Sequence, residues 1–165
     1  METLILLGSP SDKPVTTKGL QILRDFGVSF DLRVASAHRS PELVKELVHG
    51  FENQGGETCI CVAGKSAHLA GVVAAHTIRP VIGVPVYTPE TAGFDALLSM
   101  GQMPKGVPVA TMGLGSAGFI NACLFTISII GRKSPGMSQK LLEFREQQVR
   151  DVVSADASER ESFRP

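Results

Sequence analysis

The sequence predicts an α/β fold, a three-layer sandwich in which helices cover both faces of a parallel sheet of about five strands. The first observation is that short, doubly apolar segments alternate with helical segments along the chain. The second is that the 17 Gly and 10 Pro are set at turns between these segments. Such alternation implies right-handed crossovers and a sheet that is buried on both faces. We expect a fold of Rossmann or flavodoxin type.

The first third of the chain contains two repeats of strand, loop and helix. The apolar run 3–8 predicts a strand, and the helix that follows its loop should end at Gly27. A second strand is expected over 28–34. The next helix should have Pro41 in its first turn and the pair Gly55-Gly56 just past its end.

The middle of the chain supplies three more strands, over 58–64, 79–86 and 107–114. Capping preference predicts a helix from Ser66 to about Thr77 between the first two. Residues 83–104 form a long connection edged by Pro and Gly, which we expect to line a site or an interface. Cys59 and Cys61 share one face of a strand, and we interpret them as reduced packing residues because no further metal ligands lie nearby in sequence.

The C-terminal part begins with a helix over 117–131 that is hydrophobic nearly all round. Such a helix is either central to its own core or covered by a second subunit, and the few layers of a small domain favour the subunit interface. An amphipathic helix over 137–153 follows. We therefore expect one domain over 1–153 and a polar tail over 154–165 that frays.

Composition argues against two classes of partner. The 16 Lys and Arg balance the 16 Asp and Glu, and no basic run stands out, so nucleic acid is not expected. No apolar stretch approaches the length of a membrane span, and the N-terminus lacks the features of a secretory signal. We expect a cytoplasmic protein.

Ligands of open parallel sheets bind beyond the carboxyl ends of the strands, so the loops there are the candidate site. In the loop 8–12, the hydroxyls of Ser9 and Ser11 and the N–H groups of the next helix suit a phosphate, while Asp12 could hold a ribose diol. Equally, Ser11 or Asp12 could serve only as an N-cap. The loop matches neither the dinucleotide nor the P-loop motif.

The loop 36–40 places His38 beside Arg39, which suits a proton shuttle next to an anion clamp, although a loop histidine can also be merely exposed or capping. In the loop 63–71, Lys65 adds charge and glycine lets the backbone approach a ligand. His68 lies in the first turn of the next helix, where capping or packing is the simpler reading. The four histidines are too scattered to predict zinc.

These stretches together resemble the PurE family of de novo purine biosynthesis, and the similarity runs from about Leu4 to Val152. The motifs that carry it are GSPSD (8–12), SAHRSPE (36–42), AGKSAHLAG (63–71), PVIGVPV (80–86), DALLSMGQMPKGVPVAT (95–111) and AG-x-x-NA (117–122). The resemblance implies a flavodoxin-like protomer that assembles into an octamer. It also implies action on aminoimidazole ribonucleotides, as small-molecule substrates, without metal or organic cofactor.

The resemblance further implies a mutase that moves a carboxyl group from the exocyclic nitrogen to the ring carbon of the imidazole. In that case His38 is the general acid and base. The residues expected at the substrate are Ser9, Ser11, Asp12, Ser36 and Arg39, and we add Lys65 and Ser66 from the third loop.

The third loop leaves the source of the carboxyl group open. Mutases of the family commonly read AGGAAHLPG there, whereas this chain has Lys65, Ser66 and Ala70 at the variable positions and looks like the AGRS of direct carboxylases. SAHR, GVPV and QMP are the mutase forms. The mutase is therefore favoured, with direct carboxylation by carbon dioxide as the first alternative and a non-catalytic phosphometabolite-binding protein on the same fold as the second.

Overall fold

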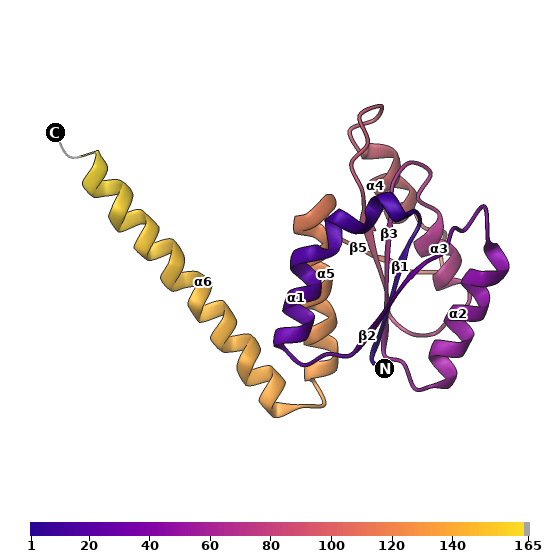
Figure 1. The fold of residues 1–165 in the computed structure, drawn as a ribbon, viewed down its shortest axis with the longest axis horizontal. Coiled ribbons are helices and arrows are strands. Elements are labelled where there is room, and N and C mark those ends of the chain that lie inside the picture. Colours follow the sequence, from indigo (N-terminus) through magenta and orange to yellow (C-terminus); the bar gives the residue numbers. More distant parts are fainter. Residues whose placement is uncertain (164–165) are drawn as a thin grey trace. The chain divides into compact units, whose positions relative to one another are not determined.

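The computed structural model describes residues 1–163, and it contains one five-stranded parallel sheet (Figure 1). The strands are β1 (Thr3–Leu7), β2 (Phe30–Val34), β3 (Thr58–Ala63), β4 (Val81–Pro85) and β5 (Ala110–Thr111). Their order across the sheet is β2-β1-β3-β4-β5. The predicted α/β class with about five parallel strands is confirmed.

Helices connect successive strands, and two further helices follow the last strand. They are the 3₁₀ helix η1 (Pro10–Thr16), α1 (Thr17–Asp25), α2 (Pro41–Asn53), α3 (Leu69–Ala74), α4 (Phe94–Gly101), α5 (Gly115–Gly131) and α6 (Pro135–Ser162). Figure 1 shows α1 and α5 on one side of the strands and α2 and α3 on the other. The chain divides into two compact units, Met1–Thr126 and Ile127–Pro165, which we describe separately.

The central strands β1 and β3 are buried along their whole length, as expected for a sheet covered on both faces. Side chains at alternate positions, including Cys59 and Cys61, pack in the same cluster as residues of α2 and α3. Both thiols are free, and burial raises the pKa of Cys59 to about 12. The interpretation of these cysteines as packing residues is confirmed.

On the other face of the sheet, α1 and α5 approach each other closely at Gly19. A Cβ atom at this position would lie 2.4 Å from Cδ1 of Phe119 and 2.9 Å from Sγ of Cys123. Both neighbours are fully buried. The missing side chain at Gly19 therefore allows the two helices to pack closely against each other.

Three elements differ from the sequence prediction. The helix predicted from Ser66 to Thr77 spans only Leu69–Ala74, because Lys65 has a left-handed backbone (φ 57°) and a tight turn joins His68 N–H to the Ser66 carbonyl. The fifth strand, predicted over 107–114, is reduced to Ala110–Thr111, since Pro108 lacks an N–H for the ladder. Within the predicted connection 83–104, residues Phe94–Gly101 form α4.

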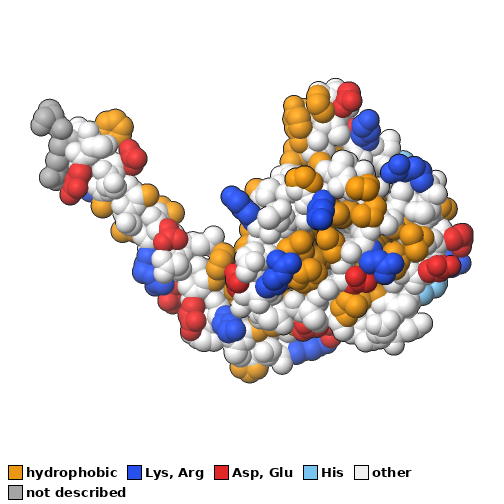
Figure 2. Space-filling view, in the orientation of Figure 1, with side chains coloured by type: hydrophobic (Ala, Val, Ile, Leu, Met, Phe, Trp, Pro, Cys, Tyr) orange, Lys and Arg blue, Asp and Glu red, His pale blue; other side chains and the backbone are white. Residues whose placement is uncertain are grey.

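The loop between β4 and α4 projects from the carboxyl end of the sheet, and hydrophobic side chains cover much of its tip at the top of Figure 2. It ends in two consecutive left-handed residues, Ala92 (φ 52°) and Gly93 (φ 79°). A Cβ atom on Gly93 would lie 2.5 Å from Leu114 Cδ2 and 3.2 Å from Tyr87 Cα. Glycine at this position thus lets the end of the loop fold back against its beginning.

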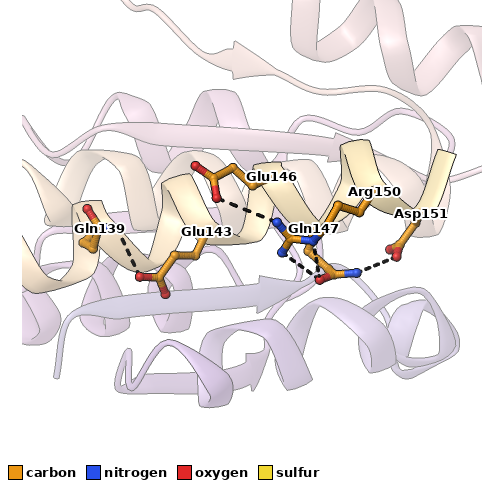
Figure 3. Close-up of polar contacts among 6 residues, drawn as sticks. All are labelled: Gln139, Glu143, Glu146, Gln147, Arg150 and Asp151. Atoms are coloured by element: carbon orange, nitrogen blue, oxygen red, sulfur yellow. Dashed lines mark hydrogen bonds and ion pairs between the residues drawn. The ribbon is translucent and has the colours of Figure 1, made fainter. Parts of the chain in front are cut away.

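The second unit consists of the end of α5 and the long helix α6, which has no buried residue. Its polar side chains are linked along the helix (Figure 3): Gln139 donates to Glu143 at 3.1 Å, and Arg150 pairs with Glu146 at 3.8 Å. Such pairs each add a few tenths of a kcal/mol, about 0.2–0.5, to helix stability. No helix within residues 1–163 has the length and hydropathy needed to cross a bilayer.

The C-terminal tail predicted to fray over 154–165 is helical as far as Ser162, while residues 164 and 165 lie outside the described part of the chain. The segment contains Ala, Glu and Arg, which are good helix formers, and these extend α6 beyond the predicted end at Val153. The division at Thr126 does not test the single domain predicted over 1–153, which stays a prediction.

Candidate active site

A cavity of about 750 Å³ lies at the carboxyl ends of four neighbouring strands. Its size is typical of small-molecule sites. Loops after β1, β2, β3 and β4 line it, with the following residues: Gly8, Ser9, Ser11, Asp12, Ser36, Ala37, His38, Arg39, Ala63, Gly64, Lys65, Ser66, Ala67, His68, Leu69, Val86, Tyr87 and Thr88. Every candidate residue from the sequence is therefore found in one cavity.

The strand order explains why these loops meet. The chain passes from β1 outward to β2 and then returns across β1 to β3, so the loops after β2 and β3 flank the loop after β1. A crevice forms at such a reversal of direction, and it is where ligands of open α/β sheets bind. Residues 8–12, 36–40 and 63–68 thus share one site although they are far apart in the chain.

The loop after β1 forms a capping box. Ser9 is the N-cap of η1, its Oγ accepts hydrogen bonds from Ser11 N–H and Ser11 Oγ, and its own N–H donates to Asp12 Oδ2 at 2.9 Å. The capping role considered for Ser11 or Asp12 thus belongs to Ser9, with Asp12 completing the box. The N–H groups of Ser11 and Asp12 and the Ser11 hydroxyl are already bonded to Ser9, so the Ser9 hydroxyl is the donor that this network leaves unused.

Asp12 is buried at the edge of the cavity, with 6% of its surface exposed. Burial raises the pKa of its carboxyl group, and the hydrogen bond from Ser9 N–H opposes part of that effect. The capping box uses Oδ2 of Asp12 and leaves Oδ1 outside the box. Asp12 is therefore held in one orientation with an acceptor available to a ligand hydroxyl.

The loop after β2 is a turn held by its own serines. Ser36 N–H donates to Ser40 Oγ at 2.9 Å, and Arg39 N–H donates to Ser36 Oγ at 3.3 Å. The Arg39 guanidinium reaches across to the first loop and donates to the Gly8 carbonyl at 3.3 Å. The positive charge is thus placed next to the serine hydroxyls of the first loop.

The loop after β3 brings a second histidine to the site. Nε2 of His38 and Nδ1 of His68 are 2.8 Å apart and joined by a hydrogen bond, and the two rings meet edge to face at an interplanar angle of 78°. One of the two nitrogens donates and the other accepts, so the contact fixes the tautomer of one ring through that of the other. His68 does not cap α3 through its side chain, and its ring packs edge to face against His38.

Sequence reasoning had no signal for this pair, because thirty residues separate His38 from His68. It also missed Tyr87 and Thr88, which line the cavity from the loop after β4. The expectation that residues 83–104 line a site contained them without naming them. Their position directly after an apolar strand is the signal that could have identified them.

Among residues 1–163, no group of three or more His, Cys, Asp or Glu side chains lies close enough together to hold a metal ion. The polar groups of the cavity are instead hydroxyls, one carboxyl, two cations and the histidine pair. Together they can bind an anion and a diol while moving a proton between a ligand and an imidazole.

Comparison with known proteins identifies the family. The model of the AIR carboxylase family matches residues 2–151. The chain belongs to this family. The family match covers all four loops of the cavity and five of the six α-helices, so the site lies entirely within the matched region.

Two similar proteins and one similar solved structure show what this chain resembles. The N5-carboxyaminoimidazole ribonucleotide mutase of Methanocaldococcus jannaschii is 44% identical over 160 residues, which cover 97% of this chain and 98% of that protein. The mutase of Pseudomonas aeruginosa is 42% identical over 149 residues, covering 90% and 91%. A crystal structure of PurE from Treponema denticola superimposes with a TM-score of 0.85 at 25% identity, covering 94% and 96%. The flavodoxin-like fold implied by the PurE resemblance is confirmed.

Proposed function

We propose that this protein is an N5-carboxyaminoimidazole ribonucleotide mutase of purine biosynthesis. The observation that carries the proposal is the His38 imidazole, held by His68 at 2.8 Å inside a cavity that also presents Arg39. The family match and the names of the relatives support the same reaction. A proton-transfer group beside an anion clamp is what carboxyl transfer on a ribonucleotide requires.

Substrate binding divides between the first two loops. The 5′-phosphate binds the hydroxyls of Ser9 and Ser11 and the Arg39 guanidinium, which the bond to Gly8 places beside them. Asp12 accepts a hydrogen bond from the ribose diol, and Ser36 lines the same pocket. The phosphate end of the ligand then lies over β1 and β2.

The reaction moves one carboxyl group within the cavity. The bond between the exocyclic nitrogen and the carboxyl carbon breaks, carbon dioxide is released, and His38 protonates the nitrogen. The electron-rich ring carbon then attacks the same carbon dioxide, and His38 removes the ring proton to restore aromaticity. No oxidant or reductant is needed, because the product is an isomer of the substrate.

His68 acts as a positioning residue for this shuttle. Its bond to His38 engages Nε2 and holds the imidazole in one orientation, which leaves the other ring nitrogen, Nδ1, for the proton that moves. Carboxyl transfer of this kind requires that carbon dioxide stay near the ring and that water be kept away while the substrate is bound.

The decisive experiment is incubation of the purified protein with N5-carboxyaminoimidazole ribonucleotide without added bicarbonate. The expected product is 4-carboxyaminoimidazole ribonucleotide, and His38→Asn should reduce its rate of formation about 10²–10⁴-fold. Turnover only with aminoimidazole ribonucleotide plus bicarbonate would replace the mutase by a direct carboxylase. Absence of both activities, with normal nucleotide binding by wild type and His38→Asn, would support the non-catalytic alternative.

The direct carboxylase is kept as a second candidate because of Lys65 and Ser66. Both line the cavity, and Lys65 is held in a left-handed conformation that costs about 1–2 kcal/mol for a residue other than glycine. A lysine at a position where glycine would avoid this backbone strain suggests that its positive charge binds an anionic ligand. We infer that both residues contact the substrate near its carboxyl group.

We propose that the chain works as a homo-oligomer in the cytoplasm, with the octamer implied by the PurE resemblance. Exposed hydrophobic side chains on α6, among them Leu142, Val149 and Val152, support association, because a long helix without buried residues gains little stability alone. The apolar composition of α5 supports it further. Light scattering at micromolar concentration that gave a monomer would contradict the oligomer.

A further inference from the structure

Tyr87 is an aromatic ring at the cavity that the proposed chemistry does not use. It lines the cavity from the loop after β4, and 60% of its surface is exposed. No residue within 1–163 forms a hydrogen bond with its hydroxyl group. It is also the only tyrosine of a chain that has no tryptophan. A large ring left uncovered at the wall of a ligand site is available for contact with that ligand.

The backbone around Tyr87 is held in place from both sides. Val86 N–H donates to the Ala63 carbonyl at 3.0 Å, which continues the pairing of β3 and β4 up to the cavity. A Cβ atom on Gly64 would lie 3.3 Å from Thr88 Cγ2, and one on Gly93 would lie 3.2 Å from Tyr87 Cα. The loop after β3 and the end of the projecting loop therefore fix the position from which the ring extends.

The strand order places Tyr87 opposite the proposed phosphate site. The cavity spans the ends of β2, β1, β3 and β4, and with about 4.8 Å between neighbouring strands it is about 14 Å across. Ser11 and Arg39 belong to loops at the β1 and β2 end, whereas Tyr87 follows β4. The bond between His38 and His68 draws the proton shuttle toward β3, between those two ends.

A ribonucleotide bound by its phosphate over β1 and β2 directs its heterocycle toward β4. We infer that Tyr87 stacks on the imidazole ring of the substrate and so selects ligands that carry a heterocycle. This inference rests on the proposed function, because the position of the substrate phosphate over β1 and β2 is part of that proposal. Removing a ring that stacks on a base typically weakens binding about tenfold.

The test uses the intrinsic fluorescence of Tyr87, because the chain has one tyrosine and no tryptophan and its tyrosine fluorescence therefore comes from that residue. Aminoimidazole ribonucleotide is titrated into the wild-type protein while tyrosine emission and, separately, the heat of binding are measured. The same calorimetry is repeated with Tyr87→Ala, Tyr87→Phe and, as a matched control, Phe94→Ala. Phe94 is similarly exposed, at 62%, and does not line the cavity. Ribose 5-phosphate serves as the ligand without a heterocycle.

The expected result is a saturable change in emission with the same Kd as the heat, and an approximately tenfold higher Kd for Tyr87→Ala. Tyr87→Phe and Phe94→Ala should bind within about twofold of wild type, and Tyr87→Ala should leave ribose 5-phosphate binding unchanged. Heat of binding without a change in emission, or wild-type affinity in Tyr87→Ala, would overturn the role of Tyr87 and leave the mutase proposal standing. No heat with the ribonucleotide would overturn both.

Discussion

Replacing His68 tests how much the reaction depends on the orientation of His38. The 2.8 Å bond between the two rings is the contact that fixes the Nε2 side of His38. A hydrogen bond to a group that becomes charged contributes about 1.5–3 kcal/mol, and about 2 kcal/mol corresponds to roughly a 30-fold change in rate. His68→Ala should therefore lower kcat about 30-fold with KM within about twofold, because no substrate contact is removed.

The matched variant is His68→Asn, whose Oδ1 is attached to Cγ as Nδ1 is in histidine and can still accept a bond from His38. It should recover most of the lost kcat. His76→Ala serves as a control, because His76 faces His49 in a similar edge-to-face contact outside the cavity. Steady-state rates of 4-carboxyaminoimidazole ribonucleotide formation provide the measurement. A wild-type kcat in His68→Ala, or equal losses in His68→Ala and His68→Asn, would refute the positioning role.

Three further substitutions test how single residues affect the stability of the folded protein. Burial raises the pKa of Asp12 above its usual 3.8, so the ionised carboxylate destabilises the folded state at pH 7. Asp12→Asn removes this ionisation and should raise Tm at pH 7. The gain in Tm should vanish as the pH falls to about 3.8, because the carboxyl group of the wild-type protein is then protonated in the folded state. Gly19→Ala would force a methyl group against Phe119 and should lower the free energy of unfolding by about 1–3 kcal/mol, measured with denaturant. Lys65→Gly should relieve the left-handed backbone and raise that free energy by up to about 1 kcal/mol.

Each of these expectations has an outcome that contradicts it. Equal stabilisation by Asp12→Asn at pH 3.5 and pH 7 would mean that ionisation is not the cause. Unchanged stability in Gly19→Ala would mean that α1 and α5 separate without cost. A less stable Lys65→Gly protein would show that the Lys65 side chain makes stabilising contacts which outweigh its backbone strain.

The fold was predictable because its central elements depend on local pattern. The apolar runs of β1 and β3 are buried on both faces, and Gly27 and Gly55 end their helices with positive φ as their positions indicated. The elements that were missed depend on tertiary context. Helix α4 buries only Ala96 and Met100, four residues apart, and this short signal is hidden in a segment rich in Pro and Gly.

The sequence predicted which loops form the candidate site, but it did not predict which side chains in those loops contact one another. Placement after parallel strands identified the loops that contain His38 and Lys65, because the carboxyl ends of those strands share one edge. The pairing of His38 with His68 depends on the order of the strands, which periodicity does not reveal. Tyr87 was missed although it follows the apolar run of β4, because the order of the strands is also needed to show that the loop after β4 borders the same cavity.

The exposure of the site residues has a consequence for how this family can evolve. His38, Arg39, Lys65 and His68 are all exposed, and none of them belongs to the buried hydrophobic cluster. Substitutions at these positions remove little packing, so they can accumulate without unfolding the protein. The chemistry of the SAHR and AGKS loops can therefore change while the scaffold that carries them stays constant.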